Sequence, residues 1–298
     1  MLQLAELQDR SHSSMKFTKL QGAGNDYLFL DGREIQEDWS SLAITMSDRH
    51  FGIGSDGIIV ARKSQKAPIR MQMFNADGSE GEMCGNGLRC FVRYIVDEGM
   101  IESQTNDILV ETGAGILSVQ SIIQDNLIKR AKVNMGSPRF LSQEIPVNVP
   151  NLIDKNIWNY PLIVEGQTIN VSCLSMGNPH AVTVINQPVN EILLEKIGPI
   201  IENLNIFPNR INFEIANIID STHINARVWE RGSGITMACG TGACAIAVVT
   251  FLNGLTETEV EIQLPGGHLI VNWDGEGDVF LEGPIEEVFK GEWIGSHI

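Results

Sequence analysis

Two short strings in the sequence place a cysteine before glycines in the same order. They are Cys84-Gly85-Asn86-Gly87 and Cys239-Gly240-Thr241-Gly242. If each cysteine begins a helix, the unpaired backbone N–H groups and the positive end of the helix dipole stabilise a thiolate and lower its pKa. The glycines let an anion approach the N–H groups that follow each sulfur. The pattern therefore predicts two basic thiols, each beside an anion-binding nest.

The segments that follow the two cysteines are predicted to be helical. Residues 86–98 are rich in apolar residues, and residues 241–253 are apolar almost all the way round, so we expect the second helix to be buried on every side. Each segment stops at a glycine fifteen residues after its cysteine, Gly99 (99 − 84) and Gly254 (254 − 239). Both glycines suit a left-handed cap at the end of a helix.

The resemblance between the two segments extends to the strands around them. Asn75 and Glu230 each end an apolar strand nine residues before a cysteine (84 − 75 and 239 − 230). Apolar or alternating runs predict short strands over residues 57–61, 69–74, 108–111, 116–119, 168–174, 181–185, 211–219, 225–229, 260–264, 269–273 and 279–282. The cysteines are 155 residues apart (239 − 84), about half of the 298 residues, which indicates a duplicated unit. We expect an α+β fold of two pseudo-symmetric domains, each with mixed or antiparallel strands wrapped around a central helix.

The repeat also suggests where the domains begin and end. The first half is expected over residues 15–132 and the second over 133–284, with the join between Lys129 and Val133. Residues 285–298 are expected to return to the first half. Residues 1–14 read as an N-terminal extension, whose removal should leave the catalytic step intact.

Composition narrows the classes of partner and location. The formal charge is 21 − 37 = −16 and 43% of residues are hydrophobic, which predicts a soluble globular protein and argues against binding to nucleic acid or to an anionic membrane. The longest nearly apolar run, Ala243–Leu252, is too short to cross a bilayer. Five cysteines without a Cys-x-x-Cys motif favour a reducing cytoplasm, and Cys90, Cys173 and Cys244 are expected to be buried core residues. Whether the protein forms a homodimer stays open at this point.

Two thiols that face each other across a cleft would suit one kind of reaction. A carboxylate held by both nests presents its α-carbon between the sulfurs, so one sulfur removes the α-proton and the other delivers a proton to the opposite face. This is racemisation or epimerisation by two bases, with the developing charge stabilised on the bound carboxylate. We expect no cofactor and no metal, because the sequence contains no phosphate-binding loop and no zinc-ligand spacing.

Several strings together identify a family. They are Gln21-Gly-Ala-Gly-Asn-Asp26, Phe74-Asn-Ala-Asp-Gly-Ser-Glu80, Met83-Cys-Gly-Asn-Gly-Leu-Arg-Cys90, Met176-Gly-Asn-Pro-His180, Glu230-Arg-Gly-Ser-Gly234 and Ala238-Cys-Gly-Thr-Gly-Ala243. From about Met15 to the C-terminus the sequence resembles diaminopimelate epimerase. The resemblance implies interconversion of LL- and meso-2,6-diaminopimelate without pyridoxal phosphate or metal, in lysine biosynthesis and, in many bacteria, peptidoglycan synthesis. It also implies an active site in the cleft between the two domains.

The resemblance assigns roles to individual residues. Cys84 and Cys239 correspond to the proton donor and acceptor, and His180 and Glu230 to the residues that tune the two thiols. The substrate-binding positions correspond to Asn25, Asn75, Gly85, Asn86, Asn178, Asn212, Glu230, Arg231, Gly240 and Thr241. Among them, Glu230 suits an ammonium group and Arg231 a distal carboxylate. Gly57 stands where some members carry a substrate-binding Gln, so no role is extended to it.

Three other interpretations stay open at this point. A racemase for proline or hydroxyproline would use the same two thiols, but a substrate with one carboxylate gives Arg231 no evident partner. Thiol redox or peroxide chemistry would use Cys84 and Cys239 directly, since two close thiols can form a disulfide. An anion-binding module would use the glycine nests and leave both cysteines unexplained.

Overall fold

Most of the regular elements of this protein are strands, and helices are few. The computed structural model describes residues 14–101, 107–150, 152 and 155–295. Within them lie eighteen strands, four α-helices and one short 3₁₀ helix, η1 (Val189–Glu191). The α+β class expected from the sequence is thereby confirmed. The proposed extension, residues 1–14, lies almost entirely outside the described residues.

The helices include both of those that the sequence predicted. They are α1 (Trp39–Ser47), α2 (Gly85–Asp97), α3 (Leu194–Glu202) and α4 (Gly240–Leu252). Gly99 and Gly254 follow the ends of α2 and α4 with φ of 64° and 68°, the left-handed conformation expected of a glycine cap. Residues 242–250 of α4 are all buried, which confirms the expectation from its nearly unbroken apolar sequence.

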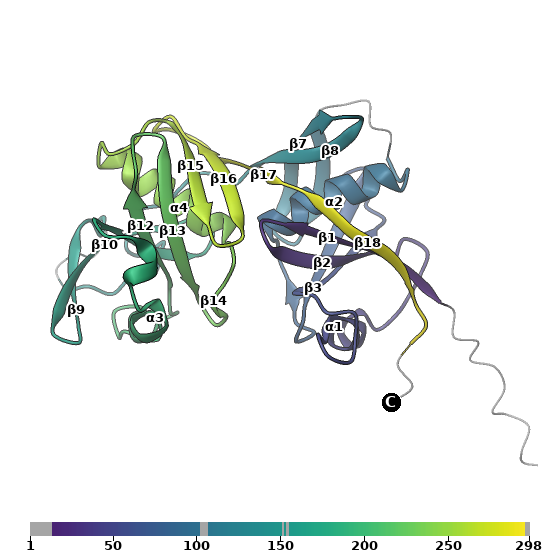
Figure 1. Ribbon diagram of the computed structural model, residues 1–298, viewed down its shortest axis with the longest axis horizontal. Coiled ribbons are helices and arrows are strands. Elements are labelled where there is room, and N and C mark those ends of the chain that lie inside the picture. Colours follow the sequence, from purple (N-terminus) through teal and green to yellow (C-terminus); the bar gives the residue numbers. More distant parts are fainter. Residues whose placement is uncertain (1–13, 102–106, 151, 153–154, 296–298) are drawn as a thin grey trace, which may run out of the picture.

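One group of elements surrounds α2 (Figure 1). Its strands are β1 (Met15–Gly22), β2 (Asn25–Asp31), β3 (Gly57–Arg62), β4 (Ile69–Asn75), β5 (Glu80–Gly81), β6 (Asp107–Thr112), β7 (Gly115–Gln124), β8 (Leu127–Asn134) and β18 (Glu286–Trp293). The last strand, β18, pairs antiparallel with the first, β1, so the end of the chain lies beside its beginning. Helix α1 covers β3 and β4 on the outside.

A second group surrounds α4 in the same way (Figure 1). Its strands are β9 (Tyr160–Val164), β10 (Gln167–Ser175), β11 (Pro179–Ile185), β12 (Asn212–Ile218), β13 (His223–Glu230), β14 (Gly234–Ile235), β15 (Glu259–Leu264), β16 (Gly267–Asn272) and β17 (Phe280–Pro284). Strand β17 pairs with β8 of the first group, and this ladder joins the two. The domain boundary expected after residue 132 falls inside β8 and stays a prediction.

The two groups share a local strand arrangement. In the first, β2 runs parallel to β3 with Phe29 opposite Ile59; in the second, β11 runs parallel to β12 with Val182 opposite Glu214. Ile59 and Glu214 are 155 residues apart (214 − 59), as the two cysteines are. Ile59 in the first group therefore corresponds to Glu214 in the second, as Cys84 corresponds to Cys239.

Several elements were not predicted, namely α1, α3, η1, β1, β2, β5, β8, β9, β14 and β18. The missed strands include β1 and β18, whose shared ladder joins residues far apart in the sequence. The eleven strands that were predicted all exist, with ends that differ by at most a few residues. None of the helices in the described part of the chain is long and apolar enough to span a membrane.

Candidate active site

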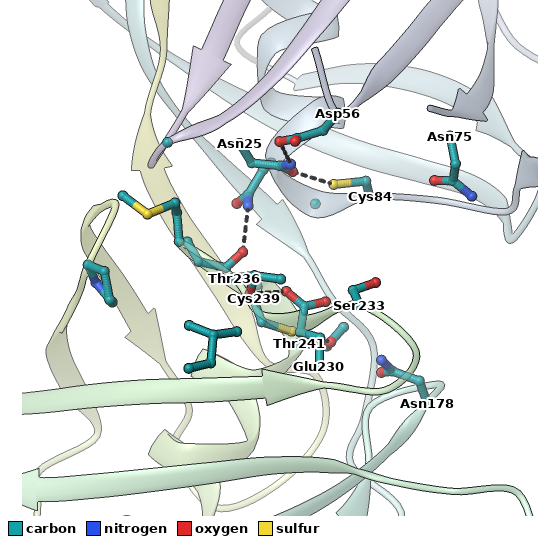
Figure 2. A pocket seen from close by; sticks show the side chains of 18 of the residues that line it. Asn25, Asp56, Asn75, Cys84, Asn178, Glu230, Ser233, Thr236, Cys239 and Thr241 are labelled. Atoms are coloured by element: carbon teal, nitrogen blue, oxygen red, sulfur yellow. Dashed lines mark hydrogen bonds between the residues drawn. The ribbon is translucent and has the colours of Figure 1, made fainter. Parts of the chain in front are cut away.

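A cavity of about 1370 Å³ is lined by residues from both groups of elements. Figure 2 shows Cys84 entering it from one side and Cys239 from the other. The structure brings most of the predicted site residues to this cavity: Asn25, Asn75, Cys84, Gly85, Asn86, Asn178, Glu230, Cys239, Gly240 and Thr241. His180, Asn212 and Arg231 are not part of its lining.

Cys84 is the N-cap residue of α2. Its backbone is extended, and its sulfur accepts a hydrogen bond from the N–H of Gly87 at 3.4 Å. The thiol donates to Oδ1 of Asn25 at 3.3 Å, and the Tyr27 hydroxyl also hydrogen-bonds to it. The sulfur therefore lies among neutral partners, and it is half-buried.

Cys239 holds the same position at the start of α4. Its sulfur accepts from the N–H of Gly242 at 3.3 Å and lies 3.4 Å from the hydroxyl oxygen of Thr241. Cys239 is more deeply buried than Cys84, with 5% of its surface exposed. The carboxylate of Glu230 is close enough for its charge to raise the pKa of Cys239. The two thiols thus share a backbone setting and differ in their partners.

The expectation that these thiols have a lowered pKa is wrong. Burial raises the pKa of Cys84, although the hydrogen bonds from Gly87 and Tyr27 act in the opposite direction. Burial raises the pKa of Cys239 well above its usual value, and the negative charges of Glu230 and Glu214 raise it further. Loss of hydration outweighs the stabilisation offered by one helix terminus, so burial favours the thiol form at both positions.

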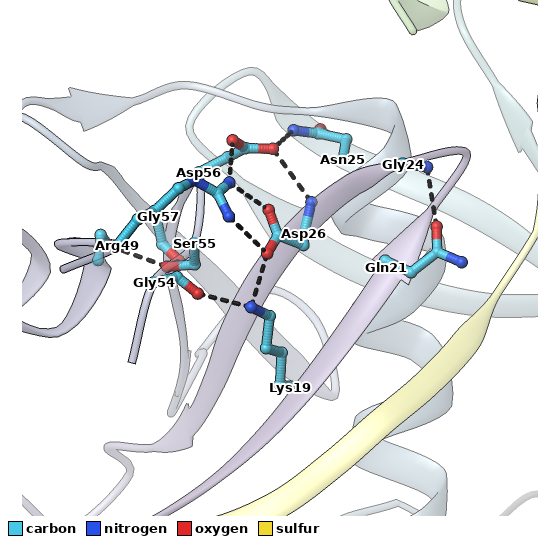
Figure 3. A network of polar contacts seen from close by, with 11 residues as sticks. Lys19, Gln21, Gly24, Asn25, Asp26, Arg49, Gly54, Ser55, Asp56 and Gly57 are labelled. Atoms are coloured by element: carbon cyan, nitrogen blue, oxygen red, sulfur yellow. Dashed lines mark hydrogen bonds and ion pairs between the residues drawn. The ribbon is translucent and has the colours of Figure 1, made fainter. Parts of the chain in front are cut away.

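A polar network on the Cys84 side fixes Asn25 (Figure 3). The side-chain amide of Asn25 donates to Asp56 at 2.5 Å, which turns its oxygen toward Cys84. Arg49 bridges Asp56 and Asp26 at 2.9 and 2.7 Å. Sequence reasoning treated Asp56 as an ordinary turn residue, since nothing near it in the chain indicated that β2 and β3 would bring it beside Asn25.

The carboxylate of Glu230 lies in the cavity next to Cys239 (Figure 2). Its Oε1 accepts a hydrogen bond from the hydroxyl of Thr236. Burial raises the pKa of Glu230, while the bond from Thr236 and the charge of His180 partly oppose the shift. An ionised Glu230 would attract an ammonium group of a ligand, and its charge raises the pKa of both cysteines.

Asn86 links the two groups of elements near the cysteines. Its side-chain amide donates to the carbonyl of Ala238, the residue before Cys239, at 3.4 Å. Its oxygen accepts from Arg89 at 2.8 Å, and Arg89 is completely buried. The sequence analysis gave no role to Arg89, although a charged residue within an apolar helix was a signal that could have drawn attention to it.

His180 lies behind the cavity wall and is fully buried. Its Nε2 lies 2.9 Å from Oδ1 of Asn178, which lines the cavity, and its Nδ1 lies 2.7 Å from Oε1 of Glu214. Burial raises the pKa of Glu214, while His180 opposes the shift. Sequence reasoning missed Glu214, although a charged residue inside the apolar run 211–219 was a usable signal.

Asn212 and Arg231 form a support next to the cavity. Asn212 donates to the carbonyl of Pro179 and accepts from the backbone N–H of Arg231, both at 2.8 Å. The guanidinium of Arg231 donates to the carbonyl of Asn209 at 3.1 Å and is not directed at the cavity wall. The arginines that do line the cavity are Arg49 and Arg227.

Solved structures with the same fold include enzymes of other activities. A phenazine biosynthesis protein of the PhzF family from Bacillus anthracis superposes with a TM-score of 0.65 at 17% sequence identity, over 94% of this chain and 99% of the other. A hydroxyproline epimerase from Agrobacterium vitis superposes with a TM-score of 0.65 at 14% identity, over 96% and 94%. At such low identity these similarities establish the fold alone.

Comparison of sequences is more specific. The diaminopimelate epimerase family model matches residues 17–141 and 172–288. A diaminopimelate epimerase from Acetivibrio thermocellus is 47% identical over 281 residues, which cover 93% of this chain and 98% of the relative. One from Methanococcus maripaludis is 41% identical over 93% of this chain and 99% of the relative. The chain therefore belongs to the diaminopimelate epimerase family.

Proposed function

We propose that this protein interconverts LL- and meso-2,6-diaminopimelate, an isomerase reaction of lysine biosynthesis. Its family membership supports this activity, and the observation that carries the mechanism is that Cys84 and Cys239, each the N-cap of a helix, line the same cavity. We propose further that the two groups of elements are pseudo-symmetric domains, and that the cavity is the active-site cleft between them. Substrate binding and catalysis are assigned to the residues below.

The reaction moves one proton off the α-carbon and another onto it. One cysteine, as thiolate, takes the α-proton, and the electron pair of the broken C–H bond moves into the carboxylate to form an enediolate. The other cysteine gives its S–H proton to the opposite face of the α-carbon, and the enediolate returns to a carboxylate. The sulfur that began as thiolate ends as thiol, and the other ends as thiolate.

The negative charge needs donors that are already in place. The backbone N–H groups of Gly85, Asn86, Gly240 and Thr241 stand at the amino ends of α2 and α4, where a carboxylate is stabilised by unpaired donors and the helix dipoles. Donors oriented before the reaction stabilise the enediolate without having to reorganise. The donors also matter for the two thiols. The pKa values of Cys84 and Cys239 are raised, so a thiolate is costly in the free protein.

The other groups suit a substrate with two amino acid ends. We assign Glu230 to an ammonium group, and Asn25, Asn75 and Asn178 to the remaining donors and acceptors, since all four line the cavity. Arg231 is assigned to the distal carboxylate. For that contact its guanidinium has to leave the carbonyl of Asn209, to which it donates in the free protein. Asn212 would then act by holding the backbone of Arg231.

The test is an incubation of the purified protein with LL-diaminopimelate in deuterium oxide, with no cofactor added. Deuterium should enter the α-position as the meso isomer appears, because the proton returned to carbon comes from a thiol that exchanges with solvent. Parallel incubations with L-proline and trans-4-hydroxy-L-proline should give no exchange. Exchange with these and none with LL-diaminopimelate would favour the alternative racemase, and absence of all exchange would refute the proposal.

A further inference from the structure

The cavity has two half-sites, one around Cys84 at the start of α2 and one around Cys239 at the start of α4. They differ in the residue that lies under each helix. In the first, a Cβ added to Gly87 of α2 would lie 2.6 Å from Cδ1 of Ile59. In the second, a Cβ added to Gly242 of α4 would lie 3.0 Å from Oε1 of Glu214. Ile59 and Glu214 hold equivalent places in the β2–β3 and β11–β12 ladders. A carboxylate therefore occupies, on one side only, a position that is apolar on the other.

The position of Glu214 is costly for a charged group. The residue is fully buried, and its Oε2 has no hydrogen-bond partner among the described residues. Among the described residues, the side chain of Glu214 forms one hydrogen bond, which joins its Oε1 to Nδ1 of His180 at 2.7 Å. A buried carboxylate that is only partly satisfied destabilises a fold. An aliphatic side chain such as that of Ile59 would avoid this cost, which points to a role in the site.

Counting protons shows what the buried pair can hold. A 2.7 Å contact between Nδ1 of His180 and Oε1 of Glu214 requires one proton between them. Nε2 of His180 faces the oxygen of Asn178 and carries a second proton. The pair is therefore neutral as a whole, but its two ends differ: the imidazole faces Asn178, and the carboxylate lies against Gly242. The same added Cβ would be 3.3 Å from the sulfur of Cys239, so the acidic end of the pair and that sulfur both lie beside Gly242.

We propose that Glu214 is a positioning residue that makes the two thiols inequivalent, because its buried carboxylate under the amino end of α4 keeps the proton on Cys239 in the free protein. The inference rests on the proposed two-thiol reaction and deepens it. That reaction needs one thiolate and one thiol at a time. The carboxylate end of a pair that is neutral as a whole, placed under α4 alone, then decides which sulfur loses its proton first.

The groups that face Glu214 come from every element around it. His180 lies on β11, Cys173 on β10, Glu230 at the end of β13, and Cys239 before α4. The charge of Glu214 raises the pKa of Cys173, Glu230 and Cys239. Glu214 is not among the largest causes of the raised pKa of Cys84. Removal of its charge should therefore act mainly on Cys239.

The experiment is a pH titration of thiolate by its ultraviolet absorbance. The Cys84→Ala chain reports Cys239, the Cys239→Ala chain reports Cys84, and the double variant gives the background. The double variant retains Cys90, Cys173 and Cys244, whose pKa values burial also raises, so its curve is subtracted from those of the single variants. Adding Glu214→Gln should lower the titration midpoint of Cys239 by about one pH unit, since a like charge is removed, and leave that of Cys84 unchanged.

Controls separate charge from shape. Glu214→Asp keeps the charge and should keep the Cys239 midpoint close to that of the parent. Glu261→Gln makes the same chemical change in an exposed pair, where Glu261 lies 2.6 Å from Nδ1 of His268, and should change neither midpoint. If Glu214→Gln does not fold, Glu214→Ile introduces the residue of the other half-site and should give the same downward shift.

Two results would overturn the inference: an unchanged Cys239 midpoint in the folded variant, or an equal shift of both cysteines. The titration needs no turnover. A protein that shifts as expected but does not epimerise diaminopimelate would contradict the proposed function and leave the role of Glu214 standing. A protein that epimerises diaminopimelate without the shift would contradict the role of Glu214 and leave the proposed function standing.

Discussion

The half-sites around Cys84 and Cys239 are built on the same backbone and carry different charges. Each sulfur caps a helix and accepts a bond from the N–H three residues on. The side chain bonded to Cys84 is that of Asn25, and the one beside Cys239 is that of Thr241. The charge of Glu230 raises the pKa of both cysteines, and the charge of Glu214 raises that of Cys239 further. The side chains under and beside the two helices therefore give two similarly placed thiols unequal affinities for a proton.

The largest expected effect comes from removing either thiol. Cys84→Ala and Cys239→Ala should each lower the rate of epimerisation by about 10⁴-fold or more, the upper end of what a general acid or base contributes. The loss should be similar for both, because neither sulfur can reach the opposite face of the α-carbon. Steady-state assays in both directions measure the rates, and circular dichroism checks the fold. Full activity in either folded variant would reject the two-base mechanism.

Glu230→Gln tests the acidic side of the comparison. We expect an activity loss of about 100-fold, because the variant removes a charge assigned both to the substrate ammonium and to the setting of the thiols. The titration midpoints of Cys84 and Cys239 should both move to lower pH, since the negative charge of Glu230 raises the pKa of each. The shift should be larger for Cys239, because the charge of Glu230 ranks directly after burial among the causes of its raised pKa and lower for Cys84.

The exposed Glu257 provides a control, because Glu257→Gln changes a carboxylate that bonds only to Ser221 in the structure. Both the rate and the two thiol titrations should stay at the values of the parent chain. Midpoints that rise in Glu230→Gln would contradict the electrostatic interpretation of the Cys239 half-site.

Asp56→Asn tests the neutral side. The charged bond from Asn25 to Asp56 holds the Asn25 oxygen toward Cys84, and a hydrogen bond to a charged group contributes about 1.5–3 kcal/mol. We expect kcat/KM to fall about tenfold or somewhat more, with Cys239 titrating as before. Asp31→Asn, which breaks the Asp31–Arg33 pair outside the cavity lining, should leave kcat/KM unchanged. Equal losses in the two variants would show that Asp56 acts only on stability.

The smallest expected effect on activity separates the two helix glycines. Gly87→Ala places a methyl group against the flexible end of Ile59, so it should destabilise the fold by about 1–3 kcal/mol and change the rate little. Gly242→Ala places its methyl between Glu214 and the sulfur of Cys239, so it should lower the rate a few-fold and displace the Cys239 titration. Denaturant unfolding and thiol titration of both variants measure the contrast. A larger loss of rate in Gly87→Ala than in Gly242→Ala would contradict this prediction.

Sequence patterns predicted the elements that carry local signals. The runs that became β3, β10 and β12 alternate or are apolar, and the glycines after α2 and α4 mark where the helices end. β1 and β18 were missed because their pairing joins residues near the start of the chain to residues near its end. Such pairing has no local signal and depends on the whole fold.

Sequence patterns likewise predicted only part of the candidate site. Motif positions such as Cys84, Glu230 and Cys239 all line the cavity, and the motifs that contain them were visible in the sequence. Asp56 and Glu214 were not recognised, because each acts through a neighbour that β-sheet pairing brings to it. The direction of the thiol pKa shifts was also predicted wrongly, since burial is a property of the folded chain.

The sequence by itself determined the family, the pair of Cys-Gly-x-Gly helix starts and the repeat that separates them, because these depend on residue types and spacing along the chain. Only the tertiary structure decided the electrostatics of the site. Whether a thiol is solvated, and whether Ile59 or Glu214 lies under its helix, follows from packing between segments distant in sequence. Desolvation and charge proximity act through space, so two half-sites with the same motif acquired different proton affinities.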